Sequence, residues 1–432
     1  MPAALRNIAA LRKLCATNSD AGEKLMRGLR PWTAVVVLFG AAALDAQGTI
    51  PSVSSSGIGD HVASLITVAD PAIPGASTPG VGYNDPRYQS PYGTGFDGVA
   101  RLLMTDDQGF VISGCTGTLL WTGQDVLTAA HCVTAGSNVV TASSVYSGFM
   151  NPTGGVTNIK SSAIYVNPAY NGGLAASPNG SAIDPNDVAI IHLSRPADSW
   201  MTGYYLYGGD PIGQTTIFAG YGLTGNGVTG GTVNTLFDDV IGTGEPVRRL
   251  AVNEWDETLS GDASTIYSGL ATPILLSDFD DGTIGNNTLC NFFGGSGNPA
   301  GLSQAELNNV CDPGYGIYEG MIDSGDSGGP GFIWDAAMGR FEVAGVASFG
   351  TQRCWNPSDG SAANVNPDGS CPANYVLNGG YFGSFAGHVD PAVGANWAFI
   401  ASATPEPSSM GLLATGLFAF LPAIVRKRRS NS

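Results

Sequence analysis

The chain has 432 residues, of which 62 are glycine and 26 are proline, and only 12% are charged. Short apolar runs between turn residues predict many strands and few helices, so we expect an all-β protein. The formal net charge is −17, which argues against nucleic-acid binding, because neutralising phosphates needs a basic surface.

The N-terminal residues have the pattern of a secretory signal. A basic stretch ending at Arg30 precedes an apolar run over residues 31–43, and the small residue Ala46 closes the segment. We therefore expect signal peptidase to remove residues 1–46 during export. A later start at Met26 would give a signal of ordinary length. A buried core helix is the alternative, but the flanks lack residues with which it could pack.

The next stretch, residues 47–95, is rich in serine, proline and glycine, and its one notable apolar patch covers residues 61–66. This composition predicts a pro-segment or linker. We expect one folded domain over residues 96–401, followed by a separate C-terminal segment over residues 402–432.

Three short motifs in the folded domain carry groups for nucleophilic chemistry. Thr-Ala-Ala-His-Cys contains His131, Asp-Val-Ala-Ile-Ile begins with Asp187, and Gly-Asp-Ser-Gly-Gly-Pro contains Ser327. A serine hydroxyl is a poor nucleophile until a base takes its proton, and that base needs an orienting carboxylate. The chain supplies all three groups.

The motifs and their order resemble those of the trypsin/chymotrypsin-like serine peptidases. The resemblance implies two six-stranded antiparallel β-barrels with a short C-terminal helix and an active site between the barrels. It implies that His131 is the general base, Asp187 orients the imidazole, and Ser327 attacks a polypeptide substrate without a cofactor. The backbone N–H groups of Gly325 and Ser327 would form the oxyanion hole. The alternative is a catalytically idle peptidase fold that serves as a surface or matrix binding module.

The resemblance also implies where a substrate side chain would bind. Met321 lies six residues before the serine, at the pocket base, where trypsins have an acidic residue. Because burying an unpaired cation is costly, we expect apolar rather than Lys or Arg specificity, unless Asp323 or a carboxylate from a loop reaches into the pocket. Ser348 matches a serine that, in the family, commonly supports the catalytic aspartate. The expected pocket residues are Met321, Ser348, Phe349 and Gly350.

Asp326, the residue before the serine, is expected to be buried and paired. In the resembled family its partner is an amino terminus freed by cleavage before Ile-Val-Gly-Gly, a tetrapeptide that this chain lacks. The bond between Arg87 and Tyr88 lies at a suitable distance upstream to be a processing site. An internal donor is the alternative.

Six of the seven cysteines lie after the predicted signal, and Cys15 lies within it. An even number in an exported chain favours disulfides. The resemblance implies the pairs Cys115–Cys132 and Cys290–Cys311 and leaves Cys354–Cys371 as the third. The chain has no Cys-x2-Cys pair and no histidine cluster, so we expect no metal site. We expect the other histidines, His61, His192 and His388, to be surface or packing residues.

The stretch between Asp187 and Ser327 is longer than is usual in the resembled family, and we place the extra loops between residues 226 and 309. Within them, the three aspartates of residues 278–281 could bind calcium through clustered oxygens, but a solvated acidic turn is the favoured interpretation. A short helix is predicted near residues 302–307.

At the C-terminus, Pro-Glu-Pro precedes an apolar run over residues 410–425 and a cluster of Arg and Lys. The run is short for a spanning helix, but a basic cluster behind it would stop translocation. This arrangement resembles the PEP-CTERM sorting signal of Gram-negative, exopolysaccharide-producing bacteria, where a membrane protease called exosortase is thought to cut near the motif. The resemblance implies a transient inner-membrane anchor and a final place at the cell surface or outside the cell. A plain C-terminal anchor is the alternative.

Overall fold

In the computed structural model the chain forms two compact units, Met1–Ala46 and Gln47–Ser432. All described residues belong to the second unit. They are residues 65–68, 88–172, 175–176, 182–227, 230–233, 247–258, 274–283, 286–293, 302–350, 352–355, 362–363 and 376–404.

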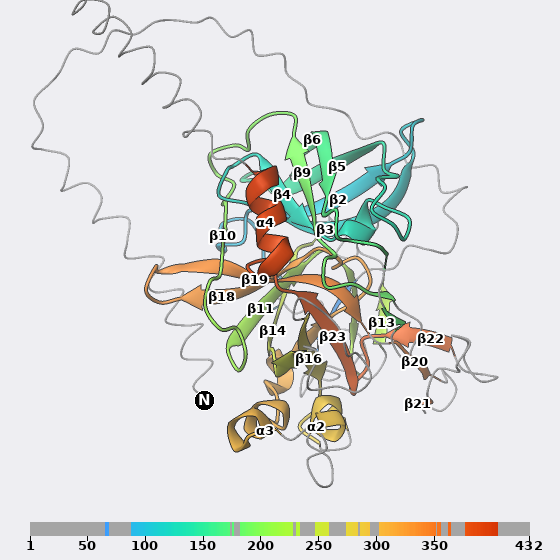
Figure 1. The fold of residues 1–432 in the computed structure, drawn as a ribbon, viewed down its shortest axis with the longest axis vertical. Coiled ribbons are helices and arrows are strands. Elements are labelled where there is room, and N and C mark those ends of the chain that lie inside the picture. Colours follow the sequence, from blue (N-terminus) through green and yellow to red (C-terminus); the bar gives the residue numbers. More distant parts are fainter. Residues whose placement is uncertain are drawn as a thin grey trace, which may run out of the picture. The chain divides into compact units, whose positions relative to one another are not determined.

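The first half of the fold is a closed six-stranded barrel with the strand order β2-β3-β4-β9-β6-β5 (Figure 1). Every pair of neighbours that the registers define is antiparallel. Closure leaves no free sheet edge, and the apolar side chains fill the interior. The strands are β2 (Val99–Thr105), β3 (Val111–Leu119), β4 (Asp125–Thr128), β5 (Ser144–Met150), β6 (Val156–Val166) and β9 (Ala189–Leu193).

The second half is a sheet with the order β14-β11-β18-β19-β23-β16-β15, and β10 pairs with β19. Its core surrounds Trp255 and Phe218, and the Phe218 ring stacks on that of His388. The all-β prediction is therefore confirmed. The strands are β10 (Tyr205–Leu206), β11 (Thr215–Gly220), β14 (Arg249–Glu254), β15 (Glu257–Thr258), β16 (Ile274–Phe279), β18 (Pro330–Asp335), β19 (Arg340–Gly350) and β23 (Ser384–Val389).

A smaller sheet has the order β13-β12-β1-β17. Its strands are β13 (Gly230–Val233), β12 (Leu223–Asn226), β1 (Leu65–Val68) and β17 (Gly320–Ile322). The strand β1 comes from the stretch upstream of the motifs, yet it pairs on both sides with strands of the folded domain. Two further small sheets contain β7 (Ala175–Ala176) with β8 (Ala182–Ile183), and β20 (Gln352–Trp355) with β21 (Ala362–Ala363) and β22 (Val376–Gly379).

Residues 88–98 also belong to the fold. The backbone carbonyl of Tyr88 accepts a hydrogen bond from the N–H of Leu250 at 2.8 Å. The guanidinium of Arg248, which is fully buried, lies 3.1 Å from the carboxylate of Asp97. Tyr88 itself is buried in the core of the second sheet.

The described helices are few and short. They are α2 (Thr288–Phe293), α3 (Gln304–Val310) and α4 (Gly394–Ala403), with the 3₁₀ turns η2 (Ala130–Cys132) and η3 (Gly316–Tyr318). The predicted helix near residues 302–307 is α3, and Ser303 and Glu306 form a capping box at its start. Within the described residues, no helix is long and apolar enough to cross a membrane; the apolar run 410–425 lies outside them.

Two disulfides have the expected partners. Cys115 on β3 is joined to Cys132 in η2, and Cys290 in α2 is joined to Cys311 at the end of α3. The third predicted pair, Cys354–Cys371, includes Cys371, which lies outside the described residues.

The interpretation of residues 278–281 as a solvated turn is wrong for two of the acidic side chains. Asp278 and Asp280 are buried, whereas Asp281 is exposed. The buried carboxylates accept hydrogen bonds from the backbone N–H groups of Leu289 and Gly282, at 3.0 Å and 2.7 Å. Burial raises the pKa of Asp278 to about 7. Their oxygens therefore hold the chain that follows β16 in place, rather than facing water.

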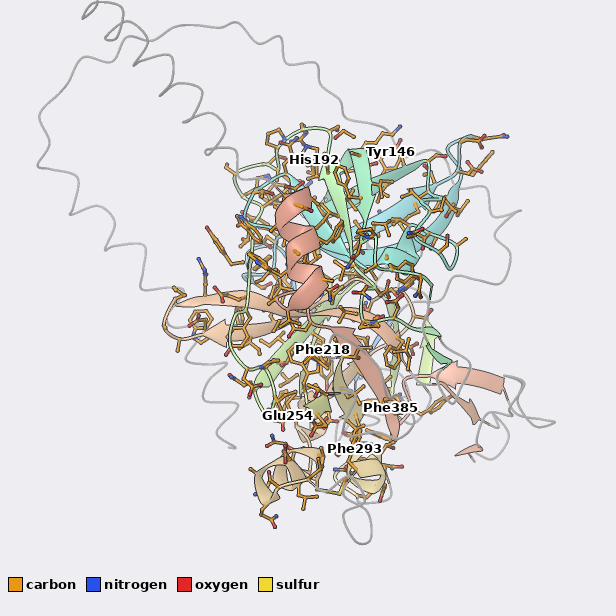
Figure 2. The ribbon with its side chains drawn as sticks, viewed as in Figure 1. Tyr146, His192, Phe218, Glu254, Phe293 and Phe385 are labelled. Atoms are coloured by element: carbon orange, nitrogen blue, oxygen red, sulfur yellow. A yellow bond between two sulfur atoms is a disulfide. The ribbon has the colours of Figure 1, made fainter. Side chains whose placement is uncertain are left out.

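The two described histidines outside the motifs have the expected packing or surface roles. His192 is partly exposed on β9, and its Nδ1 lies 2.6 Å from the Asp125 carboxylate (Figure 2). His388 is fully buried and accepts a hydrogen bond from the indole N–H of Trp255 at 3.2 Å. Burial lowers the pKa of His388 to about 3. His61 lies outside the described residues.

Candidate active site

His131 lies in the 3₁₀ turn that follows β4. The residues around it, Ala129 and Ala130, are fully buried, and the Cys115–Cys132 disulfide ties the turn to β3. The backbone N–H of His131 donates to Asp187 Oδ1 at 2.8 Å. The small alanines and the disulfide therefore fix the backbone from which the imidazole projects.

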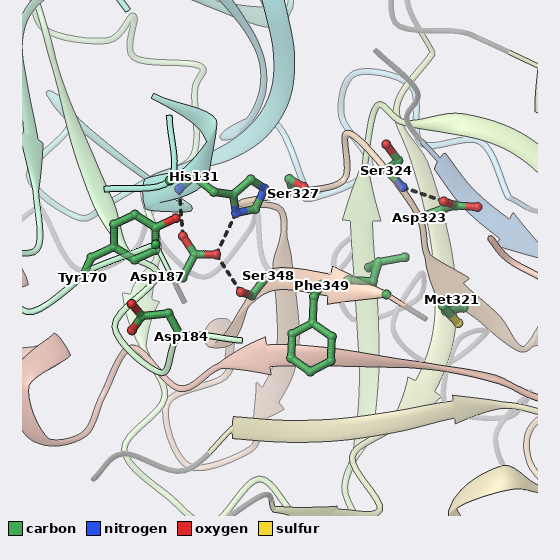
Figure 3. A pocket seen from close by; sticks show the side chains of 14 residues that line it. His131, Tyr170, Asp184, Asp187, Met321, Asp323, Ser324, Ser327, Ser348 and Phe349 are labelled. Atoms are coloured by element: carbon green, nitrogen blue, oxygen red, sulfur yellow. Dashed lines mark hydrogen bonds and ion pairs between the residues drawn. The ribbon is translucent and has the colours of Figure 1, made fainter. Parts of the chain in front are cut away.

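Asp187 lies just before β9 and is only 3% exposed. Its Oδ2 lies 2.7 Å from His131 Nδ1 and also accepts the Ser348 hydroxyl at 2.6 Å (Figure 3). An ionised carboxylate can only accept, so Nδ1 carries the imidazole proton and Nε2 is left as the acceptor. This is the tautomer that a general base requires.

The loop that carries Asp187 is braced from two directions. Asp184 Oδ1 accepts the backbone N–H of Asn186 at 2.9 Å. The side-chain amide of Asn396, in α4, donates to the backbone carbonyl of Pro185 at 2.9 Å and accepts from Asn167 at 2.9 Å. The C-terminal helix therefore sets the position of the loop, a role that local sequence patterns did not predict.

Opposite charges shift the pKa values of the pair in opposite directions. Burial opposes the charged form of His131, but the charge and hydrogen bond of Asp187 outweigh it and raise the pKa of His131 above 6.5. Burial alone would raise the pKa of Asp187, but His131, the Ser348 hydroxyl and the backbone N–H of His131 lower it. The arrangement thus stabilises an imidazolium beside a carboxylate.

Ser327 lies in a tight turn between β17 and β18. Gly325 and Gly328 have φ angles of +89° and +78° there, which favour glycine. A Cβ on Gly328 would lie 2.0 Å from Thr128 Oγ1, so a larger residue would collide with the strand that leads to His131. Figure 3 shows Ser327 beside the imidazole, although its hydroxyl makes no hydrogen bond to the ring in this conformation.

The turn is anchored to the first barrel through Thr116. The Thr116 hydroxyl donates to the carbonyl of Gly325 at 3.0 Å, and its N–H donates to the carbonyl of Ser327 at 3.0 Å. Within the described part of the chain, the backbone N–H groups of Gly325 and Ser327 donate to no other backbone carbonyl.

Asp326 is fully buried behind the serine. Its carboxylate accepts the backbone N–H of Gly222 at 3.0 Å and that of Asp323 at 3.2 Å. Burial raises the pKa of Asp326 well above its usual value, and both N–H groups and the charge of Arg249 counteract this. Arg249 is itself 1% exposed.

The same pocket is lined by the expected catalytic residues and by the expected specificity residues. Met321 is 1% exposed, and its Cε would be 3.3 Å from a Cβ added to Gly350, so the two residues face each other. Figure 3 shows Met321 and Asp323 at the end of the pocket away from His131. The pocket is lined by His131, Gly136, Tyr170, Gly172, Asp184, Asp187, Met321, Ile322, Asp323, Ser324, Ser327, Ser348, Phe349 and Gly350.

Several of these residues were not identified from the sequence. Tyr170 is 4% exposed and lies close enough to Asp187 for its pKa to be raised by that charge in addition to burial. Asp184 stands in Asp-Pro-Asn-Asp, three residues before Asp187, and this turn-like sequence was the available signal for a loop-bracing carboxylate.

Comparison with known families agrees with this geometry. The trypsin family model matches residues 99–247, which contain His131 and Asp187. This stretch is similar to the trypsin family. Ser327 lies beyond the matched residues, and the fold brings it into the same pocket as His131 and Asp187. A second family model, the PEP-CTERM protein-sorting motif, matches residues 403–429. No curated protein matches the sequence.

The two matches together indicate a serine-type peptidase hydrolase that is exported and targeted to the surface or the outside of a Gram-negative cell. A peptidase domain implies polypeptide substrates, and the sorting motif implies processing by an exosortase-like protease.

Proposed function

We propose that the protein is a secreted serine endopeptidase that cleaves peptide bonds through a His131–Asp187–Ser327 triad and an acyl-enzyme. The observation that carries the proposal is the 2.7 Å contact between His131 Nδ1 and Asp187 Oδ2 in the pocket that contains Ser327. The second buried bond to that carboxylate, from Ser348, holds it in the orientation that keeps Nε2 unprotonated.

In the proposed reaction, Nε2 of His131 takes the Ser327 proton as Oγ attacks the substrate carbonyl carbon. Asp187 stabilises the resulting imidazolium, and the N–H groups of Gly325 and Ser327 donate to the oxyanion. The imidazolium then protonates the leaving amine, which leaves an acyl ester on Ser327. Water, deprotonated by His131, attacks the ester and releases the second product.

Active-site labelling tests the proposal directly. A fluorophosphonate should react with one serine of the purified protein, and peptide mass spectrometry should locate the adduct on Ser327. Ser324 and Ser348 line the same pocket and serve as internal controls. The Ser348 hydroxyl donates to Asp187 rather than to the imidazole, and Figure 3 shows Ser324 at the end of the pocket away from His131. A protein that is folded but not labelled would indicate a catalytically idle binding module instead.

The pocket predicts the preferred substrate side chain. Met321 places a thioether where a cationic side chain would need a counter-ion, so we expect substrates with Leu, Phe, Met or Ala before the scissile bond to have higher kcat/KM values. The difference from Lys or Arg substrates should be about 10-fold or more. The measurement is kcat/KM on a matched peptide series.

Asp323 offers an alternative source of specificity, because its carboxylate would favour Lys or Arg substrates. It lines the pocket, its Oδ2 has no hydrogen-bond partner among the described residues, and burial raises its pKa to about 7. If Arg substrates prove best, and Asp323→Asn removes that preference, then Asp323 and not Met321 sets the specificity.

The sorting signal should be separable from catalysis. Thr404 is 2% exposed and its hydroxyl donates to the carbonyl of Ile400 at 2.8 Å, so it completes α4. We expect a chain that ends at residue 404 to be soluble and to keep the kcat/KM of the mature enzyme. Replacing Pro405, Glu406 and Pro407 by alanine should leave the unprocessed chain in the inner membrane.

The measurement is cell fractionation with mass spectrometry of the mature C-terminus in a host that has a sorting protease. Active full-length protein that reaches the surface with Ser432 still attached would contradict this prediction.

A further inference from the structure

Asp326 holds two separate segments of the chain through its carboxylate. One hydrogen bond comes from the N–H of Gly222, which directly precedes β12. The other comes from the N–H of Asp323, which directly follows β17. The relative position of β12 and β17 therefore determines whether both N–H groups can reach Asp326, the neighbour of the serine.

These two strands do not pair with each other in the small sheet. The strand β1 lies between them, parallel to β12 and antiparallel to β17. Ile66 is opposite Thr224 on one side and Ile322 on the other. Neighbouring strands lie about 4.8 Å apart, so β1 keeps β12 and β17 about 10 Å apart and connects them by backbone hydrogen bonds.

Without β1, the edge of β12 and the edge of β17 that face each other would both lack a hydrogen-bonded neighbour. The gap between the two strands would be too wide for them to pair directly. The start of β17 has another anchor, because the side-chain amide of Asn253 donates to the carbonyl of Gly320 at 3.0 Å. The end of β17, which leads into Asp323 and Gly325, depends on its pairing with β1. Loss of β1 would therefore loosen the segment from the end of β17 to Asp326, whereas Thr116 would still hold the carbonyls of Gly325 and Ser327.

We propose that residues 65–68 are a positioning strand of the mature enzyme, which orders the Ser327 turn and its oxyanion donors by joining β12 to β17. The inference rests on the proposed peptidase function. It follows that cleavage between residues 69 and 87 leaves β1 bound and the enzyme active, and that the upstream segment is a structural part of the enzyme.

Proline substitution tests the strand. Proline cannot donate to a sheet ladder, and β1 is an inner strand with partners on both sides. We expect the double variant Ile66→Pro, Thr67→Pro to lower kcat by about 10²- to 10³-fold, the loss that follows removal of an oxyanion donor. KM should change much less. The matched control is Ala76→Pro, Ser77→Pro, in a stretch that already contains prolines, which should keep the wild-type kcat.

A rescue experiment covers the case in which the proline variant does not fold. Residues 61–70 of the full chain are replaced by a Gly-Ser linker, and a synthetic peptide with the sequence of residues 61–70 is added. We expect the peptide to restore kcat in a saturable manner, whereas a peptide with prolines at positions 66 and 67 should not. Failure of the wild-type peptide to raise kcat would overturn the proposal.

Amide hydrogen exchange separates this inference from the proposed function. In the linker variant, the N–H groups of Gly222 and Asp323 should exchange faster, and the peptide should restore their protection. A wild-type protein without peptidase activity would refute the proposed function alone. Unchanged exchange at both groups, or an active proline variant with wild-type kcat, would refute the positioning strand.

Discussion

Replacing either Ser327 or His131 with alanine is expected to lower kcat by about 10⁶-fold, and the double variant should lose no more than either single variant. The two side chains act as one unit, because the hydroxyl is a nucleophile only when Nε2 takes its proton. Once one of the two side chains is absent, the other no longer contributes to catalysis, so the second substitution causes no further loss of kcat. The measurement is kcat on a peptide amide, with circular dichroism to show that each variant is folded.

The chain offers a matched control for each substitution. His192→Ala removes another histidine whose Nδ1 contacts a carboxylate, but this one lies on β9 outside the pocket. Ser324→Ala removes another serine that lines the pocket. Both controls should keep kcat within about 3-fold of wild type, because neither side chain hydrogen-bonds to His131 or Asp187. Equal losses in His192→Ala and His131→Ala would contradict the assignment of the base.

Changing Asp187 to asparagine should lower kcat by about 10⁴-fold, the loss measured for such a change in a related triad. The remaining amide oxygen is needed by the backbone N–H of His131, which donates to Oδ1 at 2.8 Å. The amide NH₂ then faces Nδ1, so Nδ1 must become the acceptor and the proton moves to Nε2. A protonated Nε2 cannot accept the proton of Ser327.

The pH profile of the same variant gives a second readout. Asp187 raises the pKa of His131 above 6.5, and only the neutral imidazole is a base. The wild-type kcat/KM should therefore rise through a midpoint above pH 6.5 and fall as the pH drops below it. Asp187→Asn removes the negative charge, so its residual activity should rise at a lower pH.

Asp125→Asn is the control for this change. It alters the other carboxylate that contacts an imidazole, 2.6 Å from His192 Nδ1, and leaves the pocket untouched. We expect wild-type kcat and an unchanged pH midpoint. A wild-type midpoint well below 6.5, unchanged in Asp187→Asn, would contradict the proposed coupling.

The sequence was most informative where chemistry is local. Tight backbone contacts restrict the size of the residues next to His131 and Ser327. At Gly328, for example, a Cβ would collide with Thr128. Such constraints leave short motifs that can be recognised without a fold. The all-β class followed from the turn residues, and two disulfides followed from the resemblance.

The parts that the sequence did not predict depend on long-range packing. The four residues 278–281 read as a polar turn, but strand pairing of β16 with β23 buries Asp278, and the Glu319 carboxylate accepts the N–H of Asp280 at 2.9 Å. Likewise, nothing local in residues 65–68 indicates partners more than 150 residues away, at 223–226 and 320–322. Composition alone made this stretch resemble a linker.

The brace between α4 and the Asp187 loop sets a limit on how the tail can be processed. Asn396 holds the carbonyl of Pro185, and the helix that carries Asn396 ends at Ala403, one residue before the buried Thr404. The Pro-Glu-Pro motif starts at the next position, residue 405. A cut within α4 would shorten the helix that carries Asn396, so we expect it to weaken the bond to Pro185. We therefore expect processing after residue 404 to leave this contact intact.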